Sequence, residues 1–139
     1  MSKFKELKVH KINRESADAV SVEFLIPKEL KTEFSFKSGQ YLTFKKEFEG
    51  KEIRRSYSIC AAPHENILKV GVKEVPGGLF STYANNTLKE GDLLESMAPM
   101  GNFTTEISSN NNKHYVLFAS GSGITPIISI AKDILHSEP

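Results

Sequence analysis

The chain has 139 residues, of which 39% are hydrophobic and 25% are charged, which suits one globular domain with its own core and excludes a disordered protein. Lysine and arginine number 18 against 17 acidic residues, so the net charge of +1 offers no electrostatic footprint for a nucleic-acid partner. The single cysteine, Cys60, excludes an internal disulfide and a four-thiolate iron–sulfur cluster built by this chain alone.

The amino terminus, MSKFKELKVH, alternates charged and apolar residues. It contains no uninterrupted apolar segment of the kind found in a signal peptide or a membrane span. We therefore expect a cytoplasmic protein with no membrane partner.

Residues 1–104 contain short segments with the alternating pattern of half-buried strands. In chain order, strands are predicted over FKELKVHKI, AVSVEFLIP, GQYLTFKKEF, IRRSYSIC, ILKVGVKEV and LLESMA. One helix interrupts them: PGGLFSTYANNTLKEGD opens with two glycines, carries apolar residues at helical spacing and closes at Gly91. Short strands at regular spacing indicate a mainly β domain, either a barrel or a sandwich.

Residues 105–113 are polar and predict a linker. Beyond it, YVLFA (Tyr115–Ala119) has the continuous apolar character of a parallel strand covered on both faces, and IISIAKDILH predicts a helix. Residues 114–139 therefore predict the first β-α unit of an α/β domain, and we expect the chain to be part of a longer polypeptide. The apolar helix has a wide stripe, which predicts self-association as a homodimer through its uncovered face.

The strand IRRSYSIC carries polar side chains on what is otherwise an apolar segment. Alternation places Arg55 and Tyr57 on one face and Ser56 and Ser58 on the other. A guanidinium can bind two phosphate oxygens and a phenol ring can stack on a flat heterocycle, so the first face suits an anionic, partly aromatic ligand. The same pattern also fits an ordinary solvated strand face.

Two glycine-rich turns are candidate phosphate sites. GGLFS, at the predicted start of a helix, offers unpaired backbone N–H groups and the Ser81 hydroxyl, although Pro-Gly-Gly is commonly just a turn. GSGITP lies between a predicted strand and helix, where dinucleotide-binding folds hold a pyrophosphate. Pro126 replaces the third glycine of the usual fingerprint, so this turn alone does not define a nucleotide site.

Taken in order, RRSYSI, VKEVPGGLFS, PMGNF and ASGSGITP resemble the ferredoxin-NADP reductase superfamily over nearly the whole chain. Within it, PGGLFSTY and APMGNF look most like the reductase components of bacterial multicomponent oxygenases, of the phenylacetyl-CoA epoxidase kind. The resemblance implies a six-stranded antiparallel Greek-key FAD-binding barrel with one helix over residues 1–104. It also implies that residues 114–139 begin an incomplete NAD(P)-binding α/β domain.

The resemblance also assigns roles to residues. Arg55 would bind the FAD pyrophosphate, Tyr57 would lie against the flavin ring, and Ser58 would be the catalytic residue near the reactive N5 atom. Ser58 faces away from Tyr57 by strict alternation, so it reaches the flavin only if the strand ends or twists there. The implied cofactor-binding residues are Arg55, Ser56, Tyr57, Ser58, Val72, Lys73, Gly77, Gly78, Leu79, Phe80, Ser81, Gly121, Gly123, Thr125 and Pro126.

The implied activity is that of a flavin-dependent oxidoreductase, which takes electrons from NAD(P)H through FAD to a ferredoxin-type iron–sulfur domain or protein. A barrel that serves only as a binding or electron-transfer interaction module is the alternative. The four histidines show no metal-ligand spacing, and we expect no metal site; they are His10, His64, His114 and His136.

Overall fold

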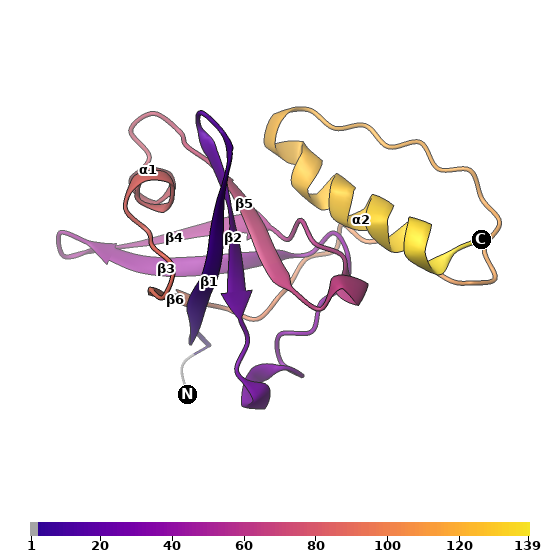
Figure 1. The fold of residues 1–139 in the computed structure, drawn as a ribbon, viewed down its shortest axis with the longest axis horizontal. Coiled ribbons are helices and arrows are strands. Elements are labelled where there is room, and N and C mark those ends of the chain that lie inside the picture. Colours follow the sequence, from indigo (N-terminus) through magenta and orange to yellow (C-terminus); the bar gives the residue numbers. More distant parts are fainter. Residues whose placement is uncertain (1–2) are drawn as a thin grey trace.

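The computed structural model describes residues 3–139 and contains one antiparallel sheet of six strands (Figure 1). The strands are β1 (Lys5–Ser16), β2 (Ala19–Leu25), β3 (Tyr41–Phe48), β4 (Lys51–Ser58), β5 (Leu68–Lys73) and β6 (Leu93–Ser96). They lie in the order β4-β3-β6-β1-β2-β5, so several neighbours in space are distant in sequence. The predicted mainly β, six-stranded antiparallel fold is confirmed.

The barrel, however, is not closed, and in that respect the prediction was wrong. The edge strands β4 and β5 meet only just beyond the end of β4, where Ile59 forms an isolated bridge with Val70. The Cys60 N–H then donates to the Lys69 carbonyl at 2.9 Å. The chain turns away at once into a short 3-10 helix, Pro63–Glu65, so it runs beside β5 for too short a distance to build a ladder.

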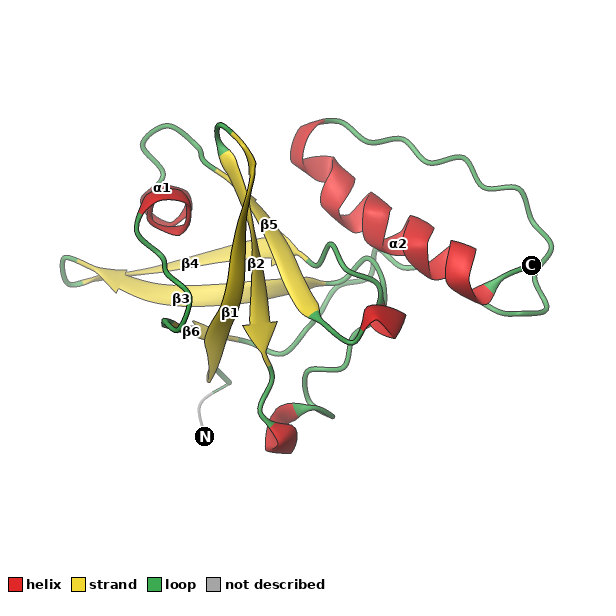
Figure 2. Cartoon of the chain, viewed as in Figure 1, coloured by secondary structure: helices red, strands yellow, loops and turns green. Residues whose placement is uncertain are grey.

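The core lies inside the curved sheet because alternate residues of each strand point inward. β2 shows the pattern clearly, with Val20, Val22 and Phe24 all buried. The helix α1 (Leu79–Asn86) lies over one end of the sheet (Figure 2) and adds Phe80 and Ala84 to this core. Its apolar spacing therefore determines which face of the helix is buried.

The second helix, α2 (Ile124–Ser137), packs against the loops at the other side of the sheet. The buried Ser129 hydroxyl donates to the Ala61 carbonyl at 2.7 Å, and Lys132 forms an ion pair with Glu65 at 3.1 Å. The Ser38 hydroxyl donates to Asp133 at 2.8 Å. Polar contacts therefore fix α2 to the loops before β3 and after β4.

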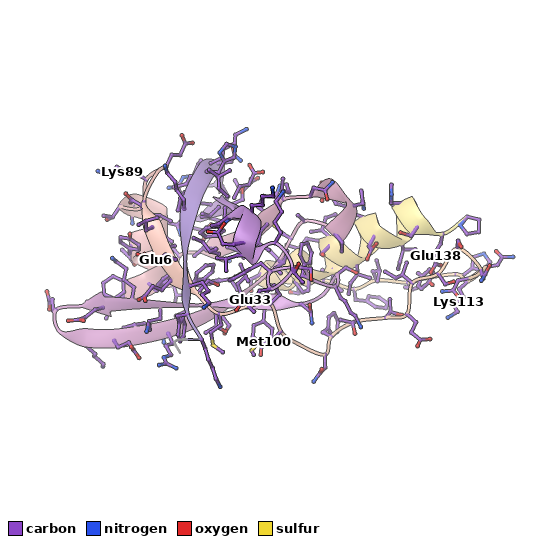
Figure 3. The ribbon with its side chains drawn as sticks, turned by 90° about the horizontal axis from the view of Figure 1, so that it is seen from below. Glu6, Glu33, Lys89, Met100, Lys113 and Glu138 are labelled. Atoms are coloured by element: carbon purple, nitrogen blue, oxygen red, sulfur yellow. The ribbon has the colours of Figure 1, made fainter. Side chains whose placement is uncertain are left out.

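The predicted parallel strand Tyr115–Ala119 is not a strand in the structure. Val116 and Phe118 are 76% and 85% exposed, and the segment belongs to a long loop, with α2 between it and the sheet (Figure 2). A parallel strand needs a neighbour for its backbone groups, and no strand within residues 3–139 pairs with this segment. Its end is held by Glu138, which accepts a 2.8 Å hydrogen bond from the Tyr115 hydroxyl; Figure 3 shows Glu138 beside Lys113 at the far end of α2.

Within the described residues, neither helix is long and apolar enough to cross a bilayer.

Candidate functional site

A pocket of about 410 Å³ opens where β4, the end of β5, the start of α1 and the turn before α2 come together. This convergence brings together three of the sequence motifs, from RRSYSI, PGGLFS and GSGITP. The lining residues are Arg55, Ser56, Tyr57, Ser58, Gly71, Lys73, Val75, Gly78, Phe80, Ser81, Ser122 and Thr125.

Arg55 and Tyr57 project from β4 into this pocket. Arg55 is exposed, and its guanidinium donates to the Arg54 carbonyl at 2.7 Å, which leaves most of its N–H groups available. Tyr57 is half-buried and stacks on Phe80, with ring centroids 5.7 Å apart and planes at 29°. Burial raises the pKa of Tyr57 above its ordinary value of 10.0, while the charge of Arg55 opposes the rise. The phenol is therefore protonated at neutral pH and can donate a hydrogen bond.

Ser58 is the last residue of β4, and this position resolves the alternation problem. Because the strand ends there, Ser58 lines the same pocket as Tyr57. It also lines a neighbouring hollow of about 350 Å³, together with Tyr41 and Phe118. Ser58 therefore lies between two hollows. Ser56 differs, because its hydroxyl shares a 2.7 Å hydrogen bond with Thr43 across the β3–β4 pair.

The start of α1 has the geometry of an anion seat. Gly78 is the N-cap, and a Cβ atom there would lie 2.6 Å from Ser81 Oγ and 3.0 Å from the Val75 carbonyl oxygen, so only glycine fits. Gly77 has φ +78°, which also favours glycine. The Ser81 hydroxyl accepts the Val75 N–H at 3.0 Å and keeps its own hydrogen to donate. The first-turn N–H groups have no acceptor within the helix and point outward.

The remaining predicted residues near α1 lie in different surroundings. Phe80 and Val72 are buried in the core, and Val72 offers only its carbonyl to Asn85. Leu79 is 50% exposed. Lys73 is exposed at the rim of the pocket and adds a second positive charge to that of Arg55.

The glycine turn before α2 is divided among three hollows. Thr125 lines the main pocket, and its hydroxyl donates to the Ser122 carbonyl at 2.9 Å. Gly123 and Pro126 line the 350 Å³ hollow with Ser58. Gly121 instead lines a hollow of about 450 Å³ between β5 and α2. The structure therefore does not bring all four predicted residues of this turn to one place.

Two residues at the site were missed from the sequence. A Cβ at Gly71 would lie 2.9 Å from the Thr125 methyl group, so this glycine lets the turn approach β5; a glycine inside a strand was the available signal. Tyr41 lines the second hollow, and its ring packs on Gly101, where a Cβ would lie 2.9 Å away. The φ of +128° at Gly101, within PMGNF, explains that motif.

The donor set of the main pocket fits FAD. Its lining contains two cations, Arg55 and Lys73, and no aspartate or glutamate. The glycine-opened helix start supplies backbone N–H groups for phosphate oxygens, and the half-buried Tyr57 supplies a flat apolar surface. Cations, unpaired N–H groups and an aromatic ring in one pocket suit a ligand with both phosphates and a planar ring. Within residues 3–139 no cluster of three metal-ligating side chains is found.

Fold and pocket together define a flavin-binding domain of the ferredoxin reductase type. Residues 6–105 match the family of oxidoreductase FAD-binding domains, and the chain belongs to that family. A 1,2-phenylacetyl-CoA epoxidase component from Escherichia coli is 40% identical over 139 residues, which cover 100% of this chain and 39% of that protein. The ferredoxin reductase component of 3-ketosteroid-9-alpha-monooxygenase from Rhodococcus rhodochrous is 34% identical and is covered to 36% by 93% of this chain.

Solved structures agree. Phthalate dioxygenase reductase superposes with a TM-score of 0.79 at 27% identity, over 97% of this chain and 41% of that one. The predicted resemblance and the FAD cofactor are thereby confirmed, with NAD(P)H as the donor typical of the family. The chain spans well under half the length of the curated relatives named above.

Proposed function

We propose that this chain is the flavin-binding part of a reductase that takes electrons from NAD(P)H through FAD to a ferredoxin-type iron–sulfur acceptor, as the reductase component of an oxygenase system. The observation that carries the proposal is the pocket in which Arg55, Tyr57, Ser58, Ser81 and Thr125 meet. The oxygenase relatives support the setting, and phthalate dioxygenase reductase is a modular structure for electron transfer from pyridine nucleotides to a 2Fe–2S centre.

The residues that would hold FAD divide by chemistry. Arg55 and Lys73 would pair with the phosphates, and the helix start at Gly78, with the Ser81 hydroxyl, would donate hydrogen bonds to them. Tyr57 would support the ring system, since Phe80 already fixes the plane of its phenol. The chemistry that FAD supplies when bound is the conversion of an electron pair from a nicotinamide into single electrons.

Ser58 is the proposed catalytic residue. Its place between the two hollows lets its hydroxyl hold a hydrogen bond to a ring nitrogen that spans them. On the other side, Thr125 and Pro126 would bound the space for a nicotinamide, and Gly121 and Gly123 would let the dinucleotide approach the backbone.

The domain organisation remains part of the proposal. Residues 1–104 form the FAD-binding domain, residues 105–113 the linker, and residues 114–139 the start of an NAD(P)-binding domain within a longer polypeptide. The exposed side chains of Ile128 (37%) and Leu135 (82%) on α2 are where the predicted self-association would occur.

An FAD titration followed by flavin absorbance and fluorescence tests the proposal. We expect saturable binding by the chain. Arg55→Ala should raise the dissociation constant by about tenfold or more, because it removes a charge-assisted phosphate contact worth about 1.5–3 kcal/mol. Arg54→Ala is the matched control: Arg54 is the neighbouring exposed arginine, and its side chain pairs with Glu52 at 3.0 Å rather than lining the pocket.

Arg54→Ala should therefore bind FAD within about twofold of the unaltered chain, since it changes the net charge equally. Equal effects of the two substitutions would reduce the role of Arg55 to general electrostatics. Absence of any flavin binding would leave the non-catalytic interaction module as the better explanation.

A further inference from the structure

The helix that carries the anion seat is too short to fix its own direction. α1 spans 8 residues, and a helix of this length is marginal in isolation. The N–H groups at its start can point at a phosphate only if the rest of the protein holds the helix axis. The contacts at its opposite end therefore bear on the seat.

Asn85 connects the last turn of α1 to the sheet. Its side chain is buried, at 6% exposure, and its Nδ2 group donates two hydrogen bonds, to the Val72 carbonyl at 3.1 Å and to the Ser81 carbonyl at 2.9 Å. Val72 lies in the edge strand β5, and Ser81 lies in the first turn of the helix. One amide thus ties the sheet edge to the turn that holds the seat.

Arg14, from β1, completes this network. Its guanidinium donates from Nη1 to Asn85 Oδ1 at 2.9 Å and from Nη2 to the Asn85 backbone carbonyl. That carbonyl is one of the last in α1 and has no acceptor role within the helix, so the cation satisfies it and complements the negative end of the helix dipole. The two-pronged contact also fixes the orientation of the Asn85 amide.

We propose that Arg14 and Asn85 are positioning residues for the phosphates of FAD, acting through the direction of α1. Asn85 lies seven residues after Gly78, which is about 10 Å along the helix, so the pair is remote from the seat itself. A seat held in place before binding avoids the ordering cost that a loose helix would pay. The inference rests on the proposed flavin site and adds two residues that do not line its pocket.

Arg14→Gln tests the inference with little risk to folding, because Arg14 is an exposed residue at the sheet surface. The FAD dissociation constant should rise by about tenfold. Binding of riboflavin, which lacks phosphates, should change by less than about twofold, because the seat contacts only phosphates. Lys11→Gln is the matched control: Lys11 is also an exposed cation of β1 and forms no side-chain hydrogen bond or ion pair within residues 3–139. It should leave both affinities unchanged.

Asn85→Ala and the double variant complete a thermodynamic cycle. If both residues act through one contact, the double variant should weaken FAD binding no more than the stronger single variant does. Equal losses for FAD and riboflavin in Arg14→Gln would indicate general destabilisation and overturn the inference. An Arg14→Gln effect that vanishes at about 0.5 M salt would make Arg14 a direct phosphate ligand and overturn it too. If the unaltered chain bound no FAD, the flavin site would fail, and the inference with it. If the unaltered chain bound FAD and Arg14→Gln bound it equally well, only the inference would fail.

Discussion

Replacing Gly78 with alanine should damage both the stability of the domain and its affinity for FAD. The backbone at Gly78, with φ −76° and ψ 120°, is open to any residue, so the cost comes from space alone. A Cβ would lie 2.6 Å from Ser81 Oγ and 3.0 Å from the Val75 carbonyl oxygen. These two atoms take part in the hydrogen bonds that close the turn, from the Val75 N–H to Ser81 at 3.0 Å and from the Gly78 N–H to Val75 at 2.8 Å.

Opening the turn to admit the methyl group would lose both bonds, at about 1 kcal/mol each, so we expect a destabilisation of about 2 kcal/mol. For a domain of this size that corresponds to a fall of about 8 °C in Tm, measured by circular dichroism on the flavin-free chain. FAD affinity should fall by about tenfold, because the first-turn N–H groups turn away from the phosphate.

Gly123→Ala provides the comparison for stability. Gly123 has φ −60°, and an added Cβ would meet nothing within 4 Å, so its Tm should not fall. If Gly78→Ala matched Gly123→Ala in Tm and kept the FAD affinity of the unaltered chain, the close turn would not be what shapes the seat, and the reasoning would be refuted.

Two further predictions concern the β4 end and the α2 contact. Ser58→Ala should leave the FAD dissociation constant nearly unchanged but slow flavin reduction by NAD(P)H about a hundredfold in stopped-flow absorbance; unchanged reduction would remove Ser58 from the mechanism. For Glu65, burial works to raise the carboxyl pKa, but the Ala62 N–H and Lys132 outweigh it and hold the pKa below its ordinary value of 4.5. A lowered folded-state pKa means that the carboxylate stabilises the fold above about pH 4.5 and loses this effect as the pH falls through the folded-state value. Glu65→Gln should therefore show a smaller Tm loss between about pH 7 and pH 4 than the unaltered chain, and an equal loss would contradict the role of the ion pair.

The strands could be predicted because their pattern is local. In β2, a period of two places three apolar side chains on one face, and no knowledge of the partner strand is needed to see it. The segment Tyr115–Ala119 has as strong an apolar signal, yet it is exposed loop in the structure. What makes an apolar run into a parallel strand is a neighbour elsewhere in the chain, and the run itself does not contain that information. Closure of the barrel failed as a prediction for a related reason, because it depends on how far the chain after Ser58 stays beside β5.

At the site, the sequence predicted which segments meet but not which atoms are free. Arg55 and Tyr57 line the pocket as expected. By contrast, Val72 turns inward to the core, because it occupies the apolar phase of β5. Gly71 was missed because its importance lies in its contact with Thr125, which is 54 positions away along the chain. Contacts of this kind follow from the assembled fold rather than from any one motif.

The two ends of the site are held by separate sets of contacts, and this division bears on function. The phosphate seat depends on α1, whose direction is set by Asn85 and its bonds to β5 and to Arg14. The turn with Thr125 depends on α2, which is fixed by Ser129 and Lys132 to the loop after β4. The Ser129 and Asn85 networks share no residue. The protein can therefore hold FAD phosphates firmly on one side while the α2 turn adjusts to a nicotinamide on the other, and Ser58, at the end of β4, lies where the two sides meet.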